Sequence, residues 1–168
     1  MYKGTADWEL IGKVKNNPRI HIPIFGNGDI NSPQKALEYR NRYGVDGIMI
    51  GRAVIGYPWL FREIKHYVQT GEILPGPTLE ERIAVSKKHL RLSVEWKGPI
   101  QGINEMRGCY ANYLKGLPDI KLFRSRLVTG KTVEEVEAVL DEVAAFYKGI
   151  ELANAPIELI DYHQNCPL

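Results

Sequence analysis

Two short apolar runs, separated by a segment with complete helix start and stop signals, constrain the fold of this chain most strongly. The runs are Arg19–Phe25 and Asp46–Ile50, and we expect both to be strands. Between them, Ser32 is a predicted N-cap, Pro33 suits the first helical position and Gly44 suits the C-terminal stop. A strand, a helix and a strand within about 30 residues form a βαβ unit, so the two strands are expected to be parallel neighbours.

The rest of the first half continues this alternation. Helices are predicted over Ala6–Asn16 and from about Tyr57 to Thr70, the second ending at Gly71. The pattern stops at Ile73–Thr78, where two prolines and a glycine interrupt the chain. Alternating strands and helices favour an α/β fold for this half.

The second half, from residue 75 to about 148, carries helical patterns only. Thr78 with Glu81, and Thr132 with Glu135, have capping-box spacing, in which a hydroxyl and a carboxylate each bind a backbone N–H at the helix start. Four helices with short Gly and Pro turns predict an all-α antiparallel bundle. The last helix is expected to bury one apolar stripe, formed by Val136, Leu140, Val143 and Tyr147. Residues 149–168 have no clear period and are expected to be a tail.

Composition excludes several classes of protein. No stretch approaches the ~18 consecutive apolar residues that a membrane span needs, and the N-terminus has no signal-peptide pattern, so no membrane partner is expected. Cys109 and Cys166 are far apart, with no CxxC spacing and no nearby His pair. They predict a reducing, cytoplasmic location and no metal site. Cys109 has helical spacing with Met106, which favours a buried thiol over a nucleophile.

Charge is divided unevenly along the second half. From Arg82 to Lys131 there are 11 Lys or Arg and 3 Asp or Glu, a net of +8, whereas Thr132–Leu168 has 1 against 8, a net of −7. Such a division is consistent with a basic face that binds a polyanion. The alternative is a solvated helical surface on which charges happen to be unevenly distributed.

Glycine-rich loops follow both predicted strands, in "IFGNGD" and "IMIGRA". Because parallel strands end at the same edge of a sheet, the two loops are expected to lie together. Glycine lets the backbone approach a ligand closely, Arg52 offers a forked cation suited to phosphate, and the next helix start would add its dipole. The loops therefore predict a phosphate site of the kind found after the last two strands of (β/α)₈ barrels. The alternative is that the glycines only make tight turns.

Four segments in this order resemble the bacterial tRNA-dihydrouridine synthases: "MYKGTADW", "IPIFGNGDI", "GVDGIMIGRAVIGYPWLF" and "YLKGLP". The likeness runs from Met1 to about Val143. The resemblance implies an FMN-binding (β/α)₈ TIM barrel followed by a helical tRNA-binding domain. It also implies an oxidoreductase that reduces the C5–C6 double bond of tRNA uridines, with NADPH reloading the flavin.

On this resemblance, residues 1–74 are the last two βα units of the barrel, 75–148 the tRNA-binding domain and 149–168 a tail. Asn27, Gly28 and Asp29 match the FMN-contacting triplet after the seventh barrel strand, and Gly51 and Arg52 match the flavin-phosphate pair after the eighth. The basic stretch then becomes the tRNA-binding surface. Its candidate residues are Lys87, Lys88, Arg91, Arg107, Lys121, Arg124 and Arg126.

The departures from the family's pattern are as informative as the matches. The family's catalytic cysteine and the lysine and histidine of its middle strands have no counterpart here, so no catalytic residue is assigned. Gly108 and Cys109 stand where relatives usually carry Lys-His. The chain is thus expected to be the C-terminal part of such an enzyme and inactive alone, with self-association or its own helices and tail covering the incomplete barrel. An RNA-binding module without catalysis, or another FMN barrel oxidoreductase, are the alternatives.

Overall fold

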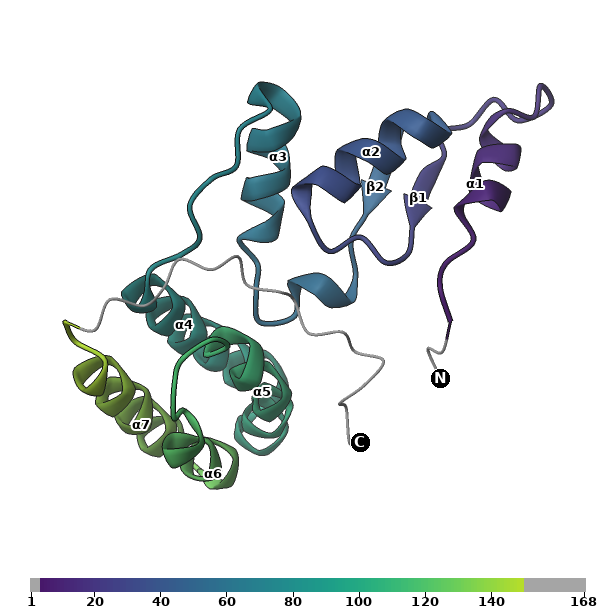
Figure 1. Ribbon diagram of the computed structural model, residues 1–168. Helices are drawn as coiled ribbons and strands as arrows, with labels where there is room; N and C mark the ends of the chain where they lie inside the picture. The colour runs from purple at the N-terminus through teal and green to yellow at the C-terminus, as the bar shows by residue number, and fades with distance from the viewer. Residues whose placement is uncertain (1–3, 150–168) are drawn as a thin grey trace. The chain divides into compact units, whose positions relative to one another are not determined.

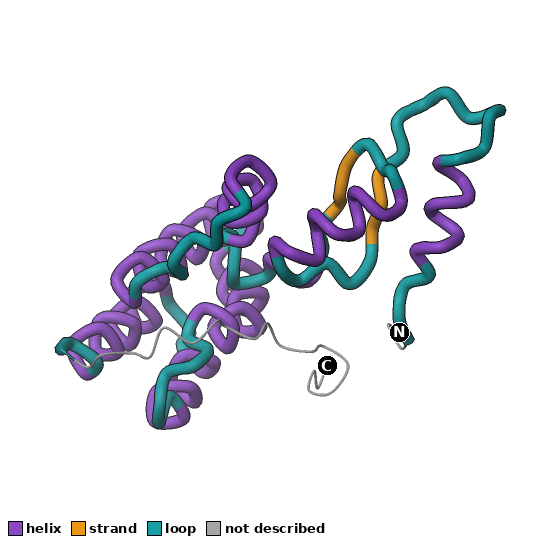
Figure 2. The backbone as a smooth tube through the Cα atoms, turned by 45° about the horizontal axis from the view of Figure 1, so that its top comes forward, coloured by secondary structure: helices purple, strands orange, loops and turns teal. Residues whose placement is uncertain are grey.

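The computed structural model describes residues 4–149 and separates into two compact units between Leu74 and Pro75. Within the described residues, the first unit alternates helices with two short strands, and the regular elements of the second are all helices (Figures 1 and 2). No strand follows Thr78 within residues 4–149, which agrees with the predicted change of pattern near Pro75.

The first unit is built around a parallel pair of strands. Its elements are α1 (Trp8–Lys15), β1 (Phe25–Asn27), α2 (Pro33–Tyr43), β2 (Gly47–Met49), the 3₁₀ turn η1 (Arg52–Val54) and α3 (Leu60–Thr70). Ser32 caps α2 by accepting the N–H of Lys35 at 3.2 Å, and Gly44 ends it at φ +65°. The predicted neighbouring, parallel arrangement of the strands is confirmed: Phe25 pairs with Gly47 and Asn27 with Met49.

The first strand is shorter than predicted and displaced along the chain. Residues 19–24, predicted as strand, form no regular strand, and β1 covers only Phe25–Asn27. Pro23 has no N–H to donate, and the N–H of Ile24 is taken at 2.7 Å by the side chain of Asp46. Regular pairing therefore begins only at Phe25.

Trp8 organises the core of the first unit. Its side chain is 3% exposed and packs edge-on against Tyr39, with ring centroids 4.8 Å apart. A Cβ added at Gly26 would lie 2.2 Å from the Trp8 ring, so β1 needs a glycine under the indole. Ile30, Ala36 and Val45 complete the buried cluster.

The opposite face of the strand pair is open. Phe25 and Met49 share this face, because the register pairs Phe25 with Gly47 and Asn27 with Met49, and side chains alternate along a strand. They are 65% and 57% exposed. No described helix covers these two side chains, and the incomplete barrel stays a prediction. The tail expected to help cover this face lies outside the described residues, apart from Gly149.

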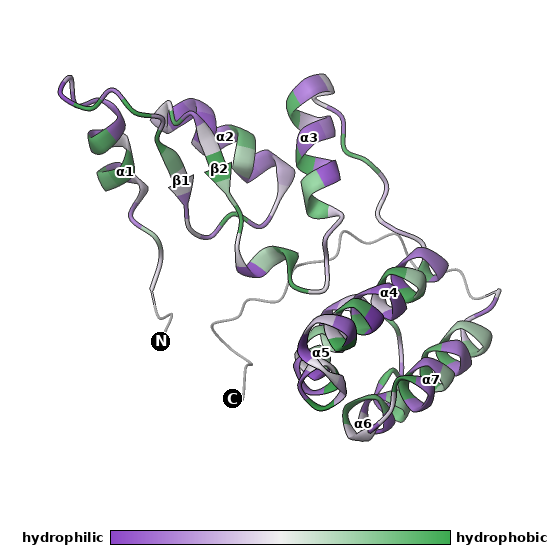
Figure 3. Ribbon diagram, turned by 180° about the vertical axis from the view of Figure 1, so that it is seen from behind, coloured by the Kyte–Doolittle hydropathy of each residue, from purple (hydrophilic) through white to green (hydrophobic). Residues whose placement is uncertain are grey.

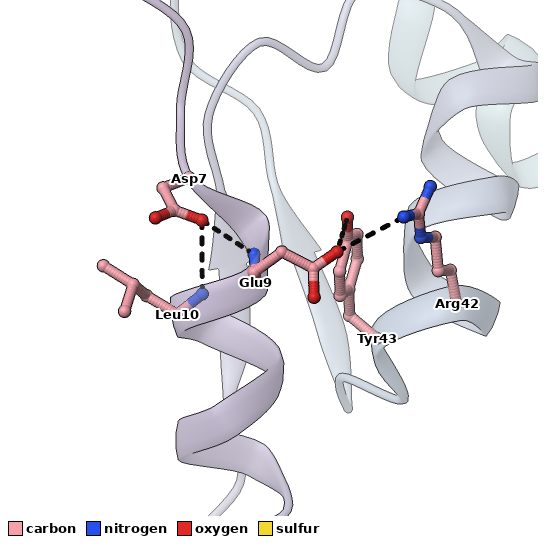
Figure 4. A network of polar contacts seen from close by, with 5 residues as sticks. All are labelled: Asp7, Glu9, Leu10, Arg42 and Tyr43. Carbon is pink, nitrogen blue, oxygen red and sulfur yellow. Dashed lines mark hydrogen bonds and ion pairs between the residues drawn. The ribbon is translucent and has the colours of Figure 1, made fainter.

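A polar network joins α1 to the end of α2 on the outer side of the unit (Figure 4). Asp7 caps α1 by accepting the N–H groups of Glu9 and Leu10 at 3.0 and 3.4 Å. Glu9 in turn accepts hydrogen bonds from Arg42 Nη2 and from the Tyr43 hydroxyl, both at 3.2 Å. Because these side chains are exposed, the network connects the two helices but adds little to stability.

The second unit is a four-helix bundle. Its elements are α4 (Leu79–Lys97), α5 (Pro99–Tyr113), α6 (Lys121–Thr129) and α7 (Val133–Phe146). Each helix carries both hydrophilic and hydrophobic residues in Figure 3, as expected of helices that share a core. The predicted stripe on the last helix is confirmed: Val136, Leu140, Val143 and Tyr147 are all buried.

The two predicted capping boxes differ in outcome. At α4 the box is complete: Thr78 Oγ1 accepts the Glu81 N–H, and Glu81 Oε2 accepts the Thr78 N–H. At α7, Thr132 accepts the Glu135 N–H, but the carboxylate of Glu135 binds the N–H of Lys131. In the second box, the carboxylate therefore binds the N–H of the residue before the N-cap and not that of the N-cap itself.

Helices α4 and α5 pack at very short range. A Cβ on Gly102 would lie 2.6 Å from the backbone N and Cα atoms of Val94, and Ser93 donates a hydrogen bond to the Gly102 carbonyl at 3.2 Å. The buried guanidinium of Arg82 adds a second connection by donating to the carbonyls of Tyr113 and Lys115. This connection ties the start of α4 to the end of α5 and satisfies carbonyls that the helix itself leaves unpaired.

Candidate anion-binding site and basic surface

The two glycine-rich loops begin side by side. Asn27 and Met49 are register partners, so the chain leaves both strands at the same edge of the pair. Immediately after β1 the backbone turns through two positive φ values, +131° at Gly28 and +54° at Asp29. A Cβ at Gly28 would lie 2.3 Å from the Cβ of Ala6, so only glycine fits there.

Three hydrogen bonds fasten this loop. Asp29 Oδ2 accepts the N–H of Ala6 at 2.7 Å, and the indole N–H of Trp8 donates to the Gly28 carbonyl at 3.0 Å. Asp29 Oδ1 lies 3.1 Å from Arg52 Nη2, an ion pair that joins the loop after β1 to the one after β2. The predicted parallel strands implied that these loops lie together, but no pattern in the sequence indicated the ion pair.

The space over Gly51 is open. A Cβ there would meet no heavy atom within 4 Å, and Gly51 is exposed. Beside it the Arg52 side chain is 34% exposed. An open glycine backbone next to a forked cation fits a phosphate group. The five predicted residues therefore lie at the ends of the two strands: Asn27 ends β1, Gly28 and Asp29 follow it, and Gly51 and Arg52 lie after β2, where η1 begins.

The helix dipole expected at this site is not there. Gly51 is followed by η1, a single 3₁₀ turn of 3 residues, and the next α-helix begins only at Leu60. The glycine-rich sequence "GRAVIGYP" interposes a turn and a proline before that helix. Any phosphate held here depends on Arg52 and on loop backbone groups.

On the second unit, three of the seven predicted RNA-binding residues are ion-paired with α7. Lys87 Nζ is 2.6 Å from an oxygen of Asp141. Arg91 makes two bonds to Glu137, at 2.6 and 2.7 Å, and Arg126 makes two to Glu142, at 2.5 and 2.7 Å. Part of the basic stretch is thus neutralised by the acidic stretch that follows it in the sequence.

The other four predicted residues make no ion pair within residues 4–149. Lys88, Lys121 and Arg124 are exposed. Arg107 is half-buried, and its Nε is buried with no hydrogen-bond partner in the described part of the chain. The groups best placed to meet an external polyanion are therefore Lys88, Lys121 and Arg124.

Arg82 is the basic residue that sequence reasoning misplaced. It counts toward the +8 stretch, yet it is 6% exposed and serves the α4–α5 connection. Its spacing from Leu79 and Ser86, three and four residues away on one helical face, was the signal that could have revealed its burial.

The described residues outside these two regions show little that points to a metal site, a membrane span or a nucleophile. No group of three His, Cys, Asp or Glu side chains in residues 4–149 could hold a metal ion, and no helix there is long and apolar enough to cross a membrane. Cys109 is half-buried; burial raises the pKa of its thiol, and the Glu105 carboxylate adds to this effect. A raised pKa disfavours a nucleophilic role, and Cys166 lies outside the described residues.

Comparisons with known proteins agree with the resemblance. Residues 1–149 match the family model described as dihydrouridine synthase (Dus). The chain is 40% identical over 147 residues to tRNA-dihydrouridine synthase B of Pseudomonas putida, covering 88% of this chain and 42% of that protein. It is 35% identical over 149 residues to a probable tRNA-dihydrouridine synthase of Rickettsia bellii, covering 89% and 44%. The chain thus spans less than half the length of these relatives.

Proposed function

Because the chain belongs to the dihydrouridine synthase family, we propose that it forms part of a flavin-dependent tRNA-dihydrouridine synthase. In this proposal the first unit is the last two βα units of an FMN-binding TIM barrel, and the second unit binds tRNA. The whole enzyme reduces uridine to 5,6-dihydrouridine in tRNA, with NADPH as the reductant, in the cytoplasm.

The observation that carries the proposal is the pair of adjacent loops at the ends of β1 and β2. In this proposal Gly51 and Arg52 hold the phosphate of the flavin. Asn27 and Gly28, at the end of the neighbouring strand, contact the flavin beside it. FMN, when bound, supplies the hydride for the double bond of uracil. This chain supplies the anchor for the phosphate end, and no group in it is proposed to transfer a proton.

The open face of the strand pair supports the barrel assignment. In a closed barrel, alternate side chains of each strand point inward and fill the interior. Phe25 and Met49 are large apolar side chains on that face, whereas the opposite face is covered through Trp8 at Gly26. Two barrel strands without the other six would expose the apolar side chains that normally fill the barrel interior. The exposed Phe25 and Met49 fit this arrangement.

The exposed cations of the second unit support tRNA as partner. Lys88, Lys121 and Arg124 offer phosphate contacts that carry no sequence information and position an RNA backbone. Lys87, Arg91 and Arg126 contribute less in this proposal, because each already has a carboxylate partner on α7. Arg107 is half-buried and makes no ion pair within residues 4–149, so we expect its contribution to tRNA binding to lie between those of the two groups.

The proposal is tested by titrating the ¹⁵N-labelled chain with FMN at millimolar concentration and, separately, with unmodified tRNA. We expect FMN to shift the amide signals of Asn27, Gly28, Gly51 and Arg52, and tRNA to shift those of Lys88, Lys121 and Arg124. Shifts with tRNA alone would favour an RNA-binding module without flavin. FMN binding without tRNA binding would favour another FMN barrel oxidoreductase.

A further inference from the structure

Asp29 is an unexpected neighbour for a phosphate. A carboxylate and a phosphate are both anionic, so direct contact between them is unfavourable. Yet Asp29 lies in the loop beside Gly51 and Arg52, with a side chain only 19% exposed. A carboxylate at this place needs a role other than holding the ligand.

Both oxygens of Asp29 are bound by the protein itself. Oδ2 accepts the Ala6 N–H, and Oδ1 accepts a hydrogen bond from Arg52 Nη2. A charge-assisted bond to one nitrogen of a planar guanidinium restricts the directions of its remaining N–H groups. The position of Asp29 is therefore one of the contacts that set the orientation of Arg52.

The position of Asp29 is itself held by the backbone. Its φ of +54° is left-handed, a conformation that Asp and Asn adopt more readily than most residues. Gly28 precedes it at φ +131°, and its carbonyl is tied to the Trp8 indole. The first residues of the unit thus fix the loop, and the loop fixes the carboxylate.

We propose that the Asp29 carboxylate is a positioning group that directs the Arg52 guanidinium toward the flavin phosphate. This inference rests on the proposed function, because it takes the anion over Gly51 and Arg52 to be that phosphate. It adds a role for the side chain to the assignment carried over by resemblance, in which Asp29 belongs to the FMN-contacting triplet.

The two roles predict opposite effects of Asp29→Asn. If the carboxylate only adds negative charge beside the phosphate, removing the charge strengthens phosphate binding. If it positions Arg52, the substitution weakens phosphate binding, because the guanidinium loses its ion pair. Asn tolerates the same left-handed φ, so the backbone of the loop is retained.

Asp46 provides a matched control. Like Asp29, it pairs with a cation and accepts one backbone N–H: Lys15 Nζ at 2.6 Å and the Ile24 N–H at 2.7 Å. It lies at the start of the strand pair, and Asp29 lies at its end. Asp46→Asn removes an equivalent ion pair far along the strands from Gly51.

The experiment titrates the whole chain, as wild type, Asp29→Asn, Asp46→Asn, Arg52→Ala and the Asp29→Asn/Arg52→Ala double variant. The probes are inorganic phosphate, FMN and riboflavin, which lacks the phosphate; amide shifts report binding, and ¹⁵Nε relaxation reports the order of the Arg52 side chain. For Asp29→Asn we expect binding of phosphate and FMN to weaken about tenfold, the lower end for a charge-assisted bond. Riboflavin binding and the Asp46→Asn control should not change, and the double variant should bind no more weakly than Arg52→Ala alone.

Several results would overturn the inference. These are tighter or unchanged phosphate binding by Asp29→Asn, an equal loss with riboflavin, or an equal loss in the Asp46→Asn control. If the wild type binds neither phosphate nor FMN, the proposed cofactor site is wrong, and this inference is overturned with it. If the wild type binds them, a loss of Arg52 side-chain order in Asp29→Asn supports positioning, and unchanged order contradicts it.

Discussion

At the scale of single residues, Glu63 shows how burial sets the cost of a charge. It is 8% exposed on α3 and accepts a hydrogen bond from the Tyr57 hydroxyl at 2.7 Å. Burial raises the pKa of its carboxyl above the usual value, and the Tyr57 bond and the Arg62 charge only partly oppose this. Compared with the unfolded chain, the folded state thus favours the protonated form of Glu63.

We predict that Glu63→Gln stabilises the first unit at neutral pH. The folded pKa is raised, so the contribution of Glu63 to stability is favourable below the unfolded pKa and is lost as pH rises through the folded pKa. Gln keeps an oxygen for the Tyr57 hydroxyl and carries no charge. Urea unfolding should show a gain at pH 7 that shrinks as pH falls through the raised folded pKa and is absent below the unfolded pKa, about 4.3. A loss of stability at every pH would mean that the charge itself is needed.

Residues also show the limit of sequence reasoning. Asn27, Gly28, Gly51 and Arg52 could be grouped from the sequence, because two strands of one βαβ unit must end at the same edge. The Asp29–Arg52 ion pair could not, because it depends on side-chain directions across 23 residues of chain. Nor could the burial of Arg82, which a charge count treats as surface.

At the scale of elements, helix ends with a capping residue were predictable and strand ends were not; α3, whose start has no side-chain cap, begins at Leu60 and not at about Tyr57 as predicted. Ser32, Gly44, Gly71 and Thr78 act through local hydrogen bonds and φ angles that a few neighbouring residues determine. The displaced start of β1 depends on a side chain from the other strand, that of Asp46. Local signals contain no information about such a contact.

We predict that Gly102→Ala separates α4 from α5. The new methyl group would meet the Val94 backbone at 2.6 Å, and backbone cannot yield as a side chain can. We expect a loss of about 1–3 kcal/mol in the free energy of unfolding, measured by urea titration of the helical circular dichroism signal. Gly108→Ala is the matched control on the same helix: it meets nothing within 4 Å and should stabilise by about 0.5–1 kcal/mol.

The ion pairs of α7 lead to a prediction about salt. Replacing Lys88, Lys121 or Arg124 by Ala should flatten the slope of log K against log salt for tRNA by about 0.7–0.9 per lost phosphate contact. Replacing Lys87, Arg91 or Arg126 should change the slope less, because each already neutralises a carboxylate. Glu137→Gln and Glu142→Gln should strengthen binding. Slopes unchanged from wild type in all six cation variants would leave only a solvated helical surface.

At the scale of the whole molecule, the sequence predicted the change from mixed strands and helices to helices alone. That change is a matter of hydrophobic period, which a sequence displays directly. The packing that joins α4 to α5, and the pairing of α4 and α6 with α7, needed the structure. They depend on a glycine contact, on the burial of the apolar stripe of α7 and on ion pairs between residues distant in the chain.

We predict that the 168-residue chain alone purifies without flavin colour and reduces no uridine. Its described part contributes two strand-end loops to a site that a barrel builds from its whole rim, and no acid in it is proposed to protonate uracil. Proton transfer by a positioned group typically contributes ~10²–10⁴-fold. An absorbance spectrum and an NADPH-dependent dihydrouridine assay on unmodified tRNA check this. A yellow chain that turns over would show that both assignments are wrong.

The indole of Trp8 over Gly26 constrains the order in which this part of the molecule can change during evolution. With the ring in place, any side chain at position 26 would overlap it, since even a Cβ comes within 2.2 Å. A mutation at 26 becomes tolerable only after Trp8 has been replaced by something smaller, whereas a change at Trp8 can come first at the cost of a cavity. Among related sequences, residues larger than glycine at position 26 should therefore occur only in lineages that have already lost the tryptophan.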